Sequence, residues 1–248
     1  MADVDVTRPS GIPVHKRDIT GVVLAGGRGS RMGGVDKGLQ PLNLEPLALH
    51  ALRALKPQCG AMLISANRSL EIYAQLGMPF QAKVVVDAFP DFPGPLAGIS
   101  AALHAAQTEF VMFVPCDAPF VDPHLAERLS EGLSAGQADI ATATVVDAAG
   151  DLNVHPVFAL MRTSLADDLD AFILAGERKV RAWYARHKAV EVTFSNDRAF
   201  YNINDLQQLA DLERNSLHRV HLDFAGVIRL MDIGQLYNRD LFCVFHSL

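Results

Sequence analysis

The chain has 248 residues, of which 50% are hydrophobic and 20% charged, and its formal net charge is −6. This length suffices for one substantial α/β core, and no apolar run reaches the roughly 18 residues that a membrane helix needs. Duplex binding normally requires a concentrated basic face, which the acidic balance argues against. We therefore expect one main domain with neither membrane nor nucleic acid as a partner.

The ends and the cysteines carry little functional signal. Residues 1–18 contain basic residues but no apolar core before a small-residue cleavage site, so we expect a flexible leader rather than a secretory signal. Cys59, Cys116 and Cys243 are odd in number and far apart, which suits neither a disulfide framework nor a C-x-x-C metal site. A reducing, cytoplasmic location is expected.

A glycine-rich loop follows the first predicted strand, residues 19–25. The loop reads Gly26-Gly27-Arg28-Gly29-Ser30-Arg31-Met32-Gly33-Gly34-Val35-Asp36-Lys37-Gly38. Glycines permit close approaches that a Cβ forbids, and successive bare N–H groups can face an anion. Arg28, Arg31 and Lys37 add fixed positive charge. The loop therefore predicts a site for several phosphates, as in a nucleoside triphosphate.

Two better-known glycine loops do not fit this spacing. The dinucleotide pattern G-x-G-x-x-G, started at Gly27, places Met32 at its third glycine. The P-loop pattern, started at Gly29, places Val35 where a lysine belongs. A purely structural turn with incidental charges is the remaining alternative, and the three cations that share the loop argue against it.

Helices and strands are expected to alternate along the rest of the first half. The expected strands are 61–66, 83–86, 110–114 and 139–144, and the expected helices are 45–55, 70–76 (capped by Ser69), 96–107 and 123–133. This alternation predicts a three-layer, Rossmann-like α/β fold with a mainly parallel central sheet. The second half is less regular, with expected strands at 154–161 and 190–194 and helices at 164–174 and 204–212. Residues 150–203 are expected to form the second wall of a cleft.

Polar residues follow three of these strands at the edge where ligands of parallel sheets lie. Asp117 follows the apolar strand 110–114, and a single strand-end carboxylate suits Mg²⁺ when phosphate oxygens and waters complete the octahedron. A helix cap or a turn is the alternative for Asp117 and for Asn67. Asp87 is a candidate ligand of ribose, base or metal-bound water, beside a loop, 92–98, that would shape the base pocket.

The run from Leu24 to Leu39 resembles the signature loop of nucleotidyltransferases, most closely the molybdenum cofactor guanylyltransferases. It reads Leu-Ala-Gly-Gly-x-Gly-x-Arg-Met-Gly-Gly-x-Asp-Lys-Gly-Leu. Further segments look like landmarks of that family, in its order: Asn67-Arg68, Asp87 with 93–98, 115–119, His155-Pro156, 176–180 and Asn202-Ile203-Asn204. The resemblance covers residues 18–213. Ser30 departs from it, because the family often has a basic residue there.

The resemblance implies the nucleotidyltransferase fold and transfer of GMP from GTP to the terminal phosphate of molybdenum-molybdopterin, with release of pyrophosphate. It implies Mg²⁺ at Asp117 and catalytic roles for Lys37, Asp117 and Arg31. GTP would be bound by Leu24, Ala25, Gly26, Gly27, Lys37, Asn67, Asp87 and Asp117. The molybdopterin would be faced by His155, Arg178, Lys179, Asn202 and Asn204. Molybdenum-insertion proteins and molybdoenzyme-specific chaperones are the implied protein partners.

The expected domain spans 19–214, with a GTP-binding half, 19–145, and an acceptor-binding half, 146–214. Residues 215–248 are expected to be a C-terminal extension of unknown role, and the spacing of His218 and His221 in it is more often incidental than metal-binding.

Several alternatives stay open. The double glycine after Leu24-Ala25 looks like the guanine-using branch, but a cytidylyl- or sugar-phosphate nucleotidyltransferase would share this architecture. A non-catalytic nucleotide-binding module is a further alternative, and the presence of both Lys37 and Asp117 argues against it. Arg178 and Lys179 would equally suit a solvated helix face.

Overall fold

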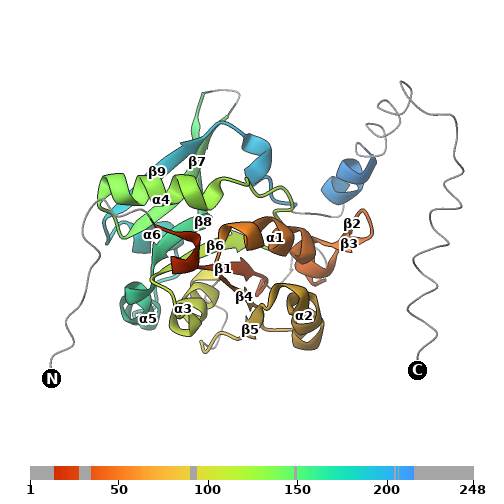
Figure 1. The fold of residues 1–248 in the computed structure, drawn as a ribbon, viewed down its shortest axis with the longest axis horizontal. Coiled ribbons are helices and arrows are strands. Elements are labelled where there is room, and N and C mark those ends of the chain that lie inside the picture. The colour runs from red at the N-terminus through yellow and green to blue at the C-terminus, as the bar shows by residue number, and fades with distance from the viewer. Residues whose placement is uncertain are drawn as a thin grey trace, which may run out of the picture. The chain divides into compact units, whose positions relative to one another are not determined.

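The computed structural model describes residues 14–27, 35–89, 94–147, 150–203, 205 and 207–214. The chain divides into two compact units, residues 1–205 and 206–248. The first unit holds a large sheet with helices around it (Figure 1), and in the second unit residues 207–214 are helical. The domain limits expected from the sequence stay a prediction, and the expectations for residues 1–13 and 215–248 lie outside the described residues.

A seven-stranded sheet forms the centre of the first unit, in the order β5-β4-β1-β6-β8-β7-β9 (Figure 1). Its strands are β1 Ile19–Leu24, β4 Ala61–Ser65, β5 Lys83–Val85, β6 Phe110–Pro115, β7 Ile140–Val146, β8 Leu152–Arg162 and β9 Ala189–Phe194. Within this described sheet, β8 runs antiparallel to β6 and β7, and the other neighbouring pairs are parallel. The predicted mainly parallel α/β fold is confirmed.

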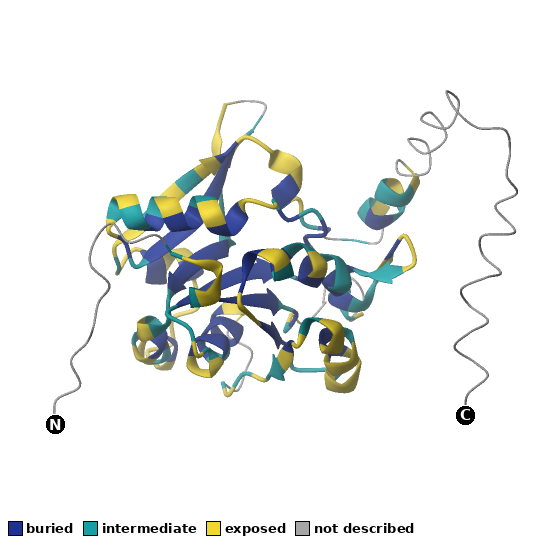
Figure 2. Ribbon diagram, viewed as in Figure 1, coloured by how far each residue is buried: buried dark blue, intermediate teal, exposed yellow. Residues whose placement is uncertain are grey.

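Helices cover both faces of the sheet. They are α1 Leu47–Leu55, α2 Leu70–Gly77, α3 Pro95–Ala105, α4 Leu125–Gly136, α5 Ala166–Leu174 and α6 Val180–Tyr184. Two apolar clusters fill the layers: one joins the sheet to α1 and α4, the other to α3, α5 and α6. In β1, Val23 belongs to the first cluster and Val22 to the second, because successive side chains of a strand point to opposite faces. Figure 2 shows the central strands of the sheet as buried and the outer sides of the helices as exposed.

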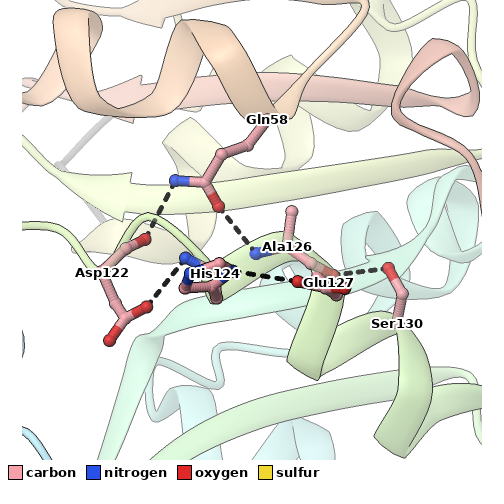
Figure 3. A network of polar contacts seen from close by, with 6 residues as sticks. All are labelled: Gln58, Asp122, His124, Ala126, Glu127 and Ser130. Atoms are coloured by element: carbon pink, nitrogen blue, oxygen red, sulfur yellow. Dashed lines mark hydrogen bonds and ion pairs between the residues drawn. The ribbon is translucent and has the colours of Figure 1, made fainter.

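Helix α4 begins at Leu125 rather than at residue 123, because polar groups occupy the turn before it (Figure 3). The carboxylate of Asp122 accepts a hydrogen bond from the backbone N–H of His124 at 2.8 Å. Buried Gln58 accepts from the N–H of Ala126 at 2.9 Å and donates to the carbonyl of Asp122 at 3.0 Å. A side chain from another segment therefore satisfies the N-terminus of this helix.

Other boundaries also differ from the expected ones. Helix α1 begins at Leu47, because Glu45 pairs with Leu42 between the short strands β2 (Pro41–Leu42) and β3 (Glu45–Pro46). Ser69 precedes α2, but the expectation that its side chain caps the helix is wrong: it makes no cap hydrogen bond and its φ is 52°. The sequence predicts no helix at α6.

Among the described residues, no helix is long and apolar enough to cross a membrane.

Strand β8 carries an irregularity that lies near the carboxyl end of β6 and midway along β7. Thr142 lies opposite Ala159, but the next residue, Ala143, lies opposite His155, so residues 156–158 interrupt the ladder. Pro156 has no N–H to donate, which suits such a bulge. Residues 150–203 thus contribute strands to the same sheet, and their expected role as the wall of a cleft stays a prediction.

Candidate functional site

Four chain segments leave the sheet at one edge. Beyond the strand ends, the N–H of Ala25 donates to Ser65 O at 2.7 Å, and the N–H of Ala66 to Val85 O at 3.0 Å. The N–H of Cys116 donates to Leu24 O at 3.0 Å. Because these bonds extend the ladders, the residues that follow β1, β4, β5 and β6 emerge side by side. This is the edge predicted to carry the site.

Lys37 and Asp117 form an ion pair at this edge. Lys37 Nζ lies 3.2 Å from Asp117 Oδ2, although the residues are 80 positions apart. Their side chains are 21% and 14% exposed. Lys37 begins a 3₁₀ turn, Lys37–Leu39, and Asp117 follows β6. The structure therefore brings together the cation and the carboxylate for which the sequence predicts phosphate and metal binding.

Asn67 and Asp87 form a second, reciprocal pair. Asn67 Nδ2 donates to Asp87 Oδ2 at 2.5 Å, and the N–H of Asp87 donates to Asn67 Oδ1 at 3.1 Å. A Cβ on Gly26 would lie 3.2 Å from Asn67 Nδ2, so this glycine lies directly against the amide. The pair fixes both side chains beside the start of the glycine loop. Gly26, Asn67 and Asp87, all predicted to bind nucleotide, are thus neighbours.

Three further residues belong to the site, and the sequence assigned none of them a role of its own. The hydroxyl of Tyr73, on α2, donates to Asp36 Oδ1 at 2.6 Å. Arg68 Nε lies 3.4 Å from Asp36 Oδ2, and Arg68 also donates to the carbonyl of Val35 at 2.9 Å. Burial raises the pKa of Tyr73, so its hydroxyl keeps the proton that it donates. In the sequence, Asp36 could be recognised because it is next to Lys37, and Arg68 because it is next to Asn67.

Gly38 shows why the turn after Lys37 needs a glycine. A Cβ at this position would lie 2.4 Å from the Tyr73 hydroxyl oxygen and 3.2 Å from Cys116 Sγ. Real Cβ atoms essentially never approach another heavy atom so closely, so the hydroxyl can reach Asp36 only because Gly38 has no side chain.

The second half of the chain returns to the same edge. The N–H of Ile203 donates to the carbonyl of Asp117 at 2.9 Å, which brings Asn202 beside the site. The ring of His155 packs 5.2 Å from that of Phe200, centroid to centroid, and desolvation lowers the pKa of the imidazole. His155 and Asn202, predicted to face the acceptor, are thus linked to Asp117 through the segment 200–203.

Arg178 and Lys179 have different surroundings. Arg178 donates to the carbonyls of Ile173 and Glu177 at 2.8 and 2.7 Å, which closes the end of α5. Lys179 is exposed at the start of α6. Arg31, with Arg28, Pro93 and Asn204, lies outside the described residues, so the roles expected of them stay predictions.

The described residues test whether Mg²⁺ suits the site. Nowhere in that part of the chain do three or more His, Cys, Asp or Glu residues form a group that could hold a metal. Asp117 offers a single carboxylate, which is the protein share that Mg²⁺ takes when phosphates and waters supply the remaining oxygens. The donor set therefore fits a metal that arrives with a triphosphate.

Comparisons with known proteins agree with this geometry. The MobA-like NTP transferase domain matches residues 21–191. The molybdenum cofactor guanylyltransferase of Burkholderia ambifaria is 58% identical over 196 residues, covering 79% of this chain and 96% of that protein. The protein of the same name from Ralstonia nicotianae is 52% identical over 201 residues, with the same coverage.

Solved structures show the same fold. Molybdopterin-guanine dinucleotide biosynthesis protein A from Archaeoglobus fulgidus has a TM-score of 0.64 at 25% identity, covering 80% of this chain and 99% of that one. The 4-diphosphocytidyl-2C-methyl-D-erythritol synthase of Anaerococcus prevotii has a TM-score of 0.63 at 10% identity, covering 82% and 99%, and shows the fold alone. The chain belongs to the MobA-like NTP transferase family and, within it, to the molybdenum cofactor guanylyltransferases.

Proposed function

We propose that the protein transfers GMP from GTP to the terminal phosphate of molybdenum-molybdopterin and releases pyrophosphate. The observation that carries the proposal is the Lys37–Asp117 pair, 3.2 Å apart at the carboxyl edge of the sheet, in a chain 58% identical to a molybdenum cofactor guanylyltransferase. A phosphate-binding cation and a metal-binding carboxylate are the two charges that such a transfer requires at one point.

The chemistry that this site must supply is positioning and charge neutralisation. The acceptor phosphate is already an anion, so no protein base has to activate it, and no protein nucleophile is required. Lys37 would bind phosphate oxygens of GTP, together with backbone N–H groups of the glycine loop. Asn67 and Asp87, held by their mutual hydrogen bonds, would bind the base or the ribose. Asp117 would hold Mg²⁺, which when bound neutralises phosphate charge.

The acceptor would lie on the side of His155 and Asn202. Half-buried His155 has a lowered pKa and is neutral near pH 7, so it would offer the pterin a hydrogen bond rather than a charge. Arg178 and Lys179 stay candidates for the acceptor anion. Molybdenum-insertion proteins and molybdoenzyme-specific chaperones would deliver the acceptor and collect the product.

A cytoplasmic location belongs to the same proposal. Cys59 and Cys116 are free and buried, and burial raises the pKa of the Cys59 thiol to about 12. Free thiols suit a reducing compartment.

The test is pyrophosphate release with each of the four nucleoside triphosphates, with and without molybdopterin. Release with GTP alone, dependent on molybdopterin, is the expected result. Preference for CTP, or release with a sugar phosphate as acceptor, would support a different nucleotidyltransferase. Binding of GTP without any release would support a non-catalytic nucleotide-binding module.

A further inference from the structure

We propose that Tyr73 is a positioning residue that acts on Lys37 through Asp36, with Arg68 as its partner on the other carboxylate oxygen. The inference rests on the proposed function, because it takes Lys37 to be a ligand of the GTP phosphates. It assigns a purpose to Tyr73, Asp36 and Arg68: Asp36 immediately precedes Lys37, and the other two side chains contact its carboxylate.

The carboxylate of Asp36 accepts a hydrogen bond at one oxygen and forms an ion-pair contact, without hydrogen-bond geometry, at the other. Its side chain is 10% exposed, and it accepts from the Tyr73 hydroxyl at 2.6 Å while pairing with Arg68 Nε at 3.4 Å. Tyr73 itself is fully buried on α2. A buried carboxylate with these two partners is costly to move, because displacement would leave charged and polar groups unsatisfied. The backbone on the amino side of Lys37 is therefore fixed.

The backbone on the carboxyl side of Lys37 is fixed by packing. Gly38 is buried, and the space that a Cβ would need there is taken by the Tyr73 hydroxyl and by Cys116. Cys116 directly precedes Asp117, so the turn that carries Lys37 rests on the residue next to its ion-pair partner. The same hydroxyl that binds Asp36 thus also sets how closely this turn approaches Asp117.

Arg68 connects this arrangement to the other half of the site. It follows Asn67, whose amide binds Asp87, and it donates to the carbonyl of Val35 at 2.9 Å. The dipeptide Asn67-Arg68, which follows β4, therefore has two roles. Asn67 holds Asp87, the other expected ligand of the base or ribose, and Arg68 holds the segment before Lys37. A shift of Lys37 relative to Asn67 would require these contacts to break.

A double-mutant cycle on GTP binding tests the proposal. Tyr73→Phe keeps the buried ring and removes only the hydroxyl. We expect it to raise the dissociation constant for GTP with Mg²⁺, measured by calorimetry, by up to about tenfold, the cost of ordering one long side chain on binding when it is no longer held in place. In a Lys37→Ala background the same change is expected to have no further effect, because the residue that it positions is gone.

The matched control is Tyr184→Phe, which removes another buried tyrosine hydroxyl, the donor to the carbonyl of Pro156 at 2.7 Å. It is expected to lower the melting temperature as Tyr73→Phe does and to show no coupling to Lys37. Equal effects of Tyr73→Phe on GTP affinity with and without Lys37, or no effect in either background, would overturn the inference.

Failure of the proposed function gives a different pattern. If the wild-type protein binds GTP but releases no pyrophosphate with any acceptor, the proposed function fails, and the binding cycle still decides the role of Tyr73. If the wild-type protein binds no triphosphate, both proposals are overturned, because Lys37 would have no phosphate to meet.

Discussion

At the scale of single residues, the ion pair between Lys37 and Asp117 is mostly buried but belongs to neither apolar cluster, so losing one partner lowers stability without removing core packing. Replacing Asp117 with Ala should therefore leave the fold intact and abolish Mg²⁺-dependent turnover, because the proposed metal ligand is removed. Thermal unfolding and pyrophosphate release over a range of Mg²⁺ concentrations measure the two effects. Near-normal rates would contradict the metal assignment.

Lys37→Ala tests the cation separately. It should lower kcat/KM for GTP by about 10- to 150-fold, since a hydrogen bond to a charged group is worth about 1.5–3 kcal/mol. Lys83→Ala is the control, because this lysine is exposed at the start of β5, away from the carboxyl edge. Unchanged kinetics in the Lys37 variant would mean that this side chain does not meet the phosphates.

Gly38→Ala tests the close approach beneath that lysine. The added methyl group would lie 2.4 Å from the Tyr73 hydroxyl oxygen, so we expect both the melting temperature and GTP affinity to fall. In a Tyr73→Phe background the added loss should be smaller, because the crowded oxygen is absent. A loss of equal size in both backgrounds would show that another neighbour, such as Cys116, limits this position.

The sequence indicated candidate nucleotide-binding roles for Lys37, Asn67, Asp87 and Asp117, because each follows a recognisable strand or lies in the glycine loop. It did not predict the contacts of Tyr73. That residue lies inside a helix, where its spacing identifies it only as a core position. The contact between Tyr73 and Asp36 depends on how α2 packs against a loop far away in sequence, and no local sequence pattern predicts such packing.

At the scale of secondary-structure elements, α4 depends on Gln58, which belongs to the turn after α1. Its side chain accepts from the N–H of Ala126 and donates to the carbonyls of Asp122 and Ala54 (Figure 3). Gln58→Leu leaves the buried N–H of Ala126 without its partner, so we expect the free energy of unfolding to fall by about 1–3 kcal/mol. Urea denaturation measures it, with exposed Gln107→Leu as the control. An unchanged midpoint would contradict the role.

The strands of the large sheet were predicted, because the central ones are buried on both faces and form continuous apolar runs, whereas the short strands β2 and β3 were missed. The direction and bulge of β8 were not predicted. Hydrophobicity shows that a strand exists, but the chain direction depends on which neighbours it joins. Helix α6, Val180–Tyr184, was missed because five residues are too few to show a helical period.

At the scale of the whole molecule, the burial of His155 against Phe158 and Phe200 makes the free energy of unfolding depend on pH. Desolvation lowers the pKa of His155 in the folded state, whereas in the unfolded chain the pKa is about 6.5. Below that pH the unfolded state binds more protons than the folded state, so the free energy of unfolding should fall as the pH drops. Urea denaturation between pH 5 and 7.5 should show a shallower dependence in His155→Gln. The control is His124→Gln, whose imidazole is 69% exposed; equal slopes in wild type and His155→Gln would contradict the prediction.

The place of β8 has a consequence for any attempt to divide the protein. This strand comes late in the chain, yet it lies between β6 and β7 and joins them. Severing the connection between Val146 and Leu152 would give a first fragment with β6 and β7 but nothing to bridge them, and a second whose central strand has lost both neighbours. β6 would expose one edge, and β7, whose neighbours β8 and β9 both lie in the second fragment, would expose two; such bare edges favour aggregation. Complementation would therefore require both pieces to be present while they fold.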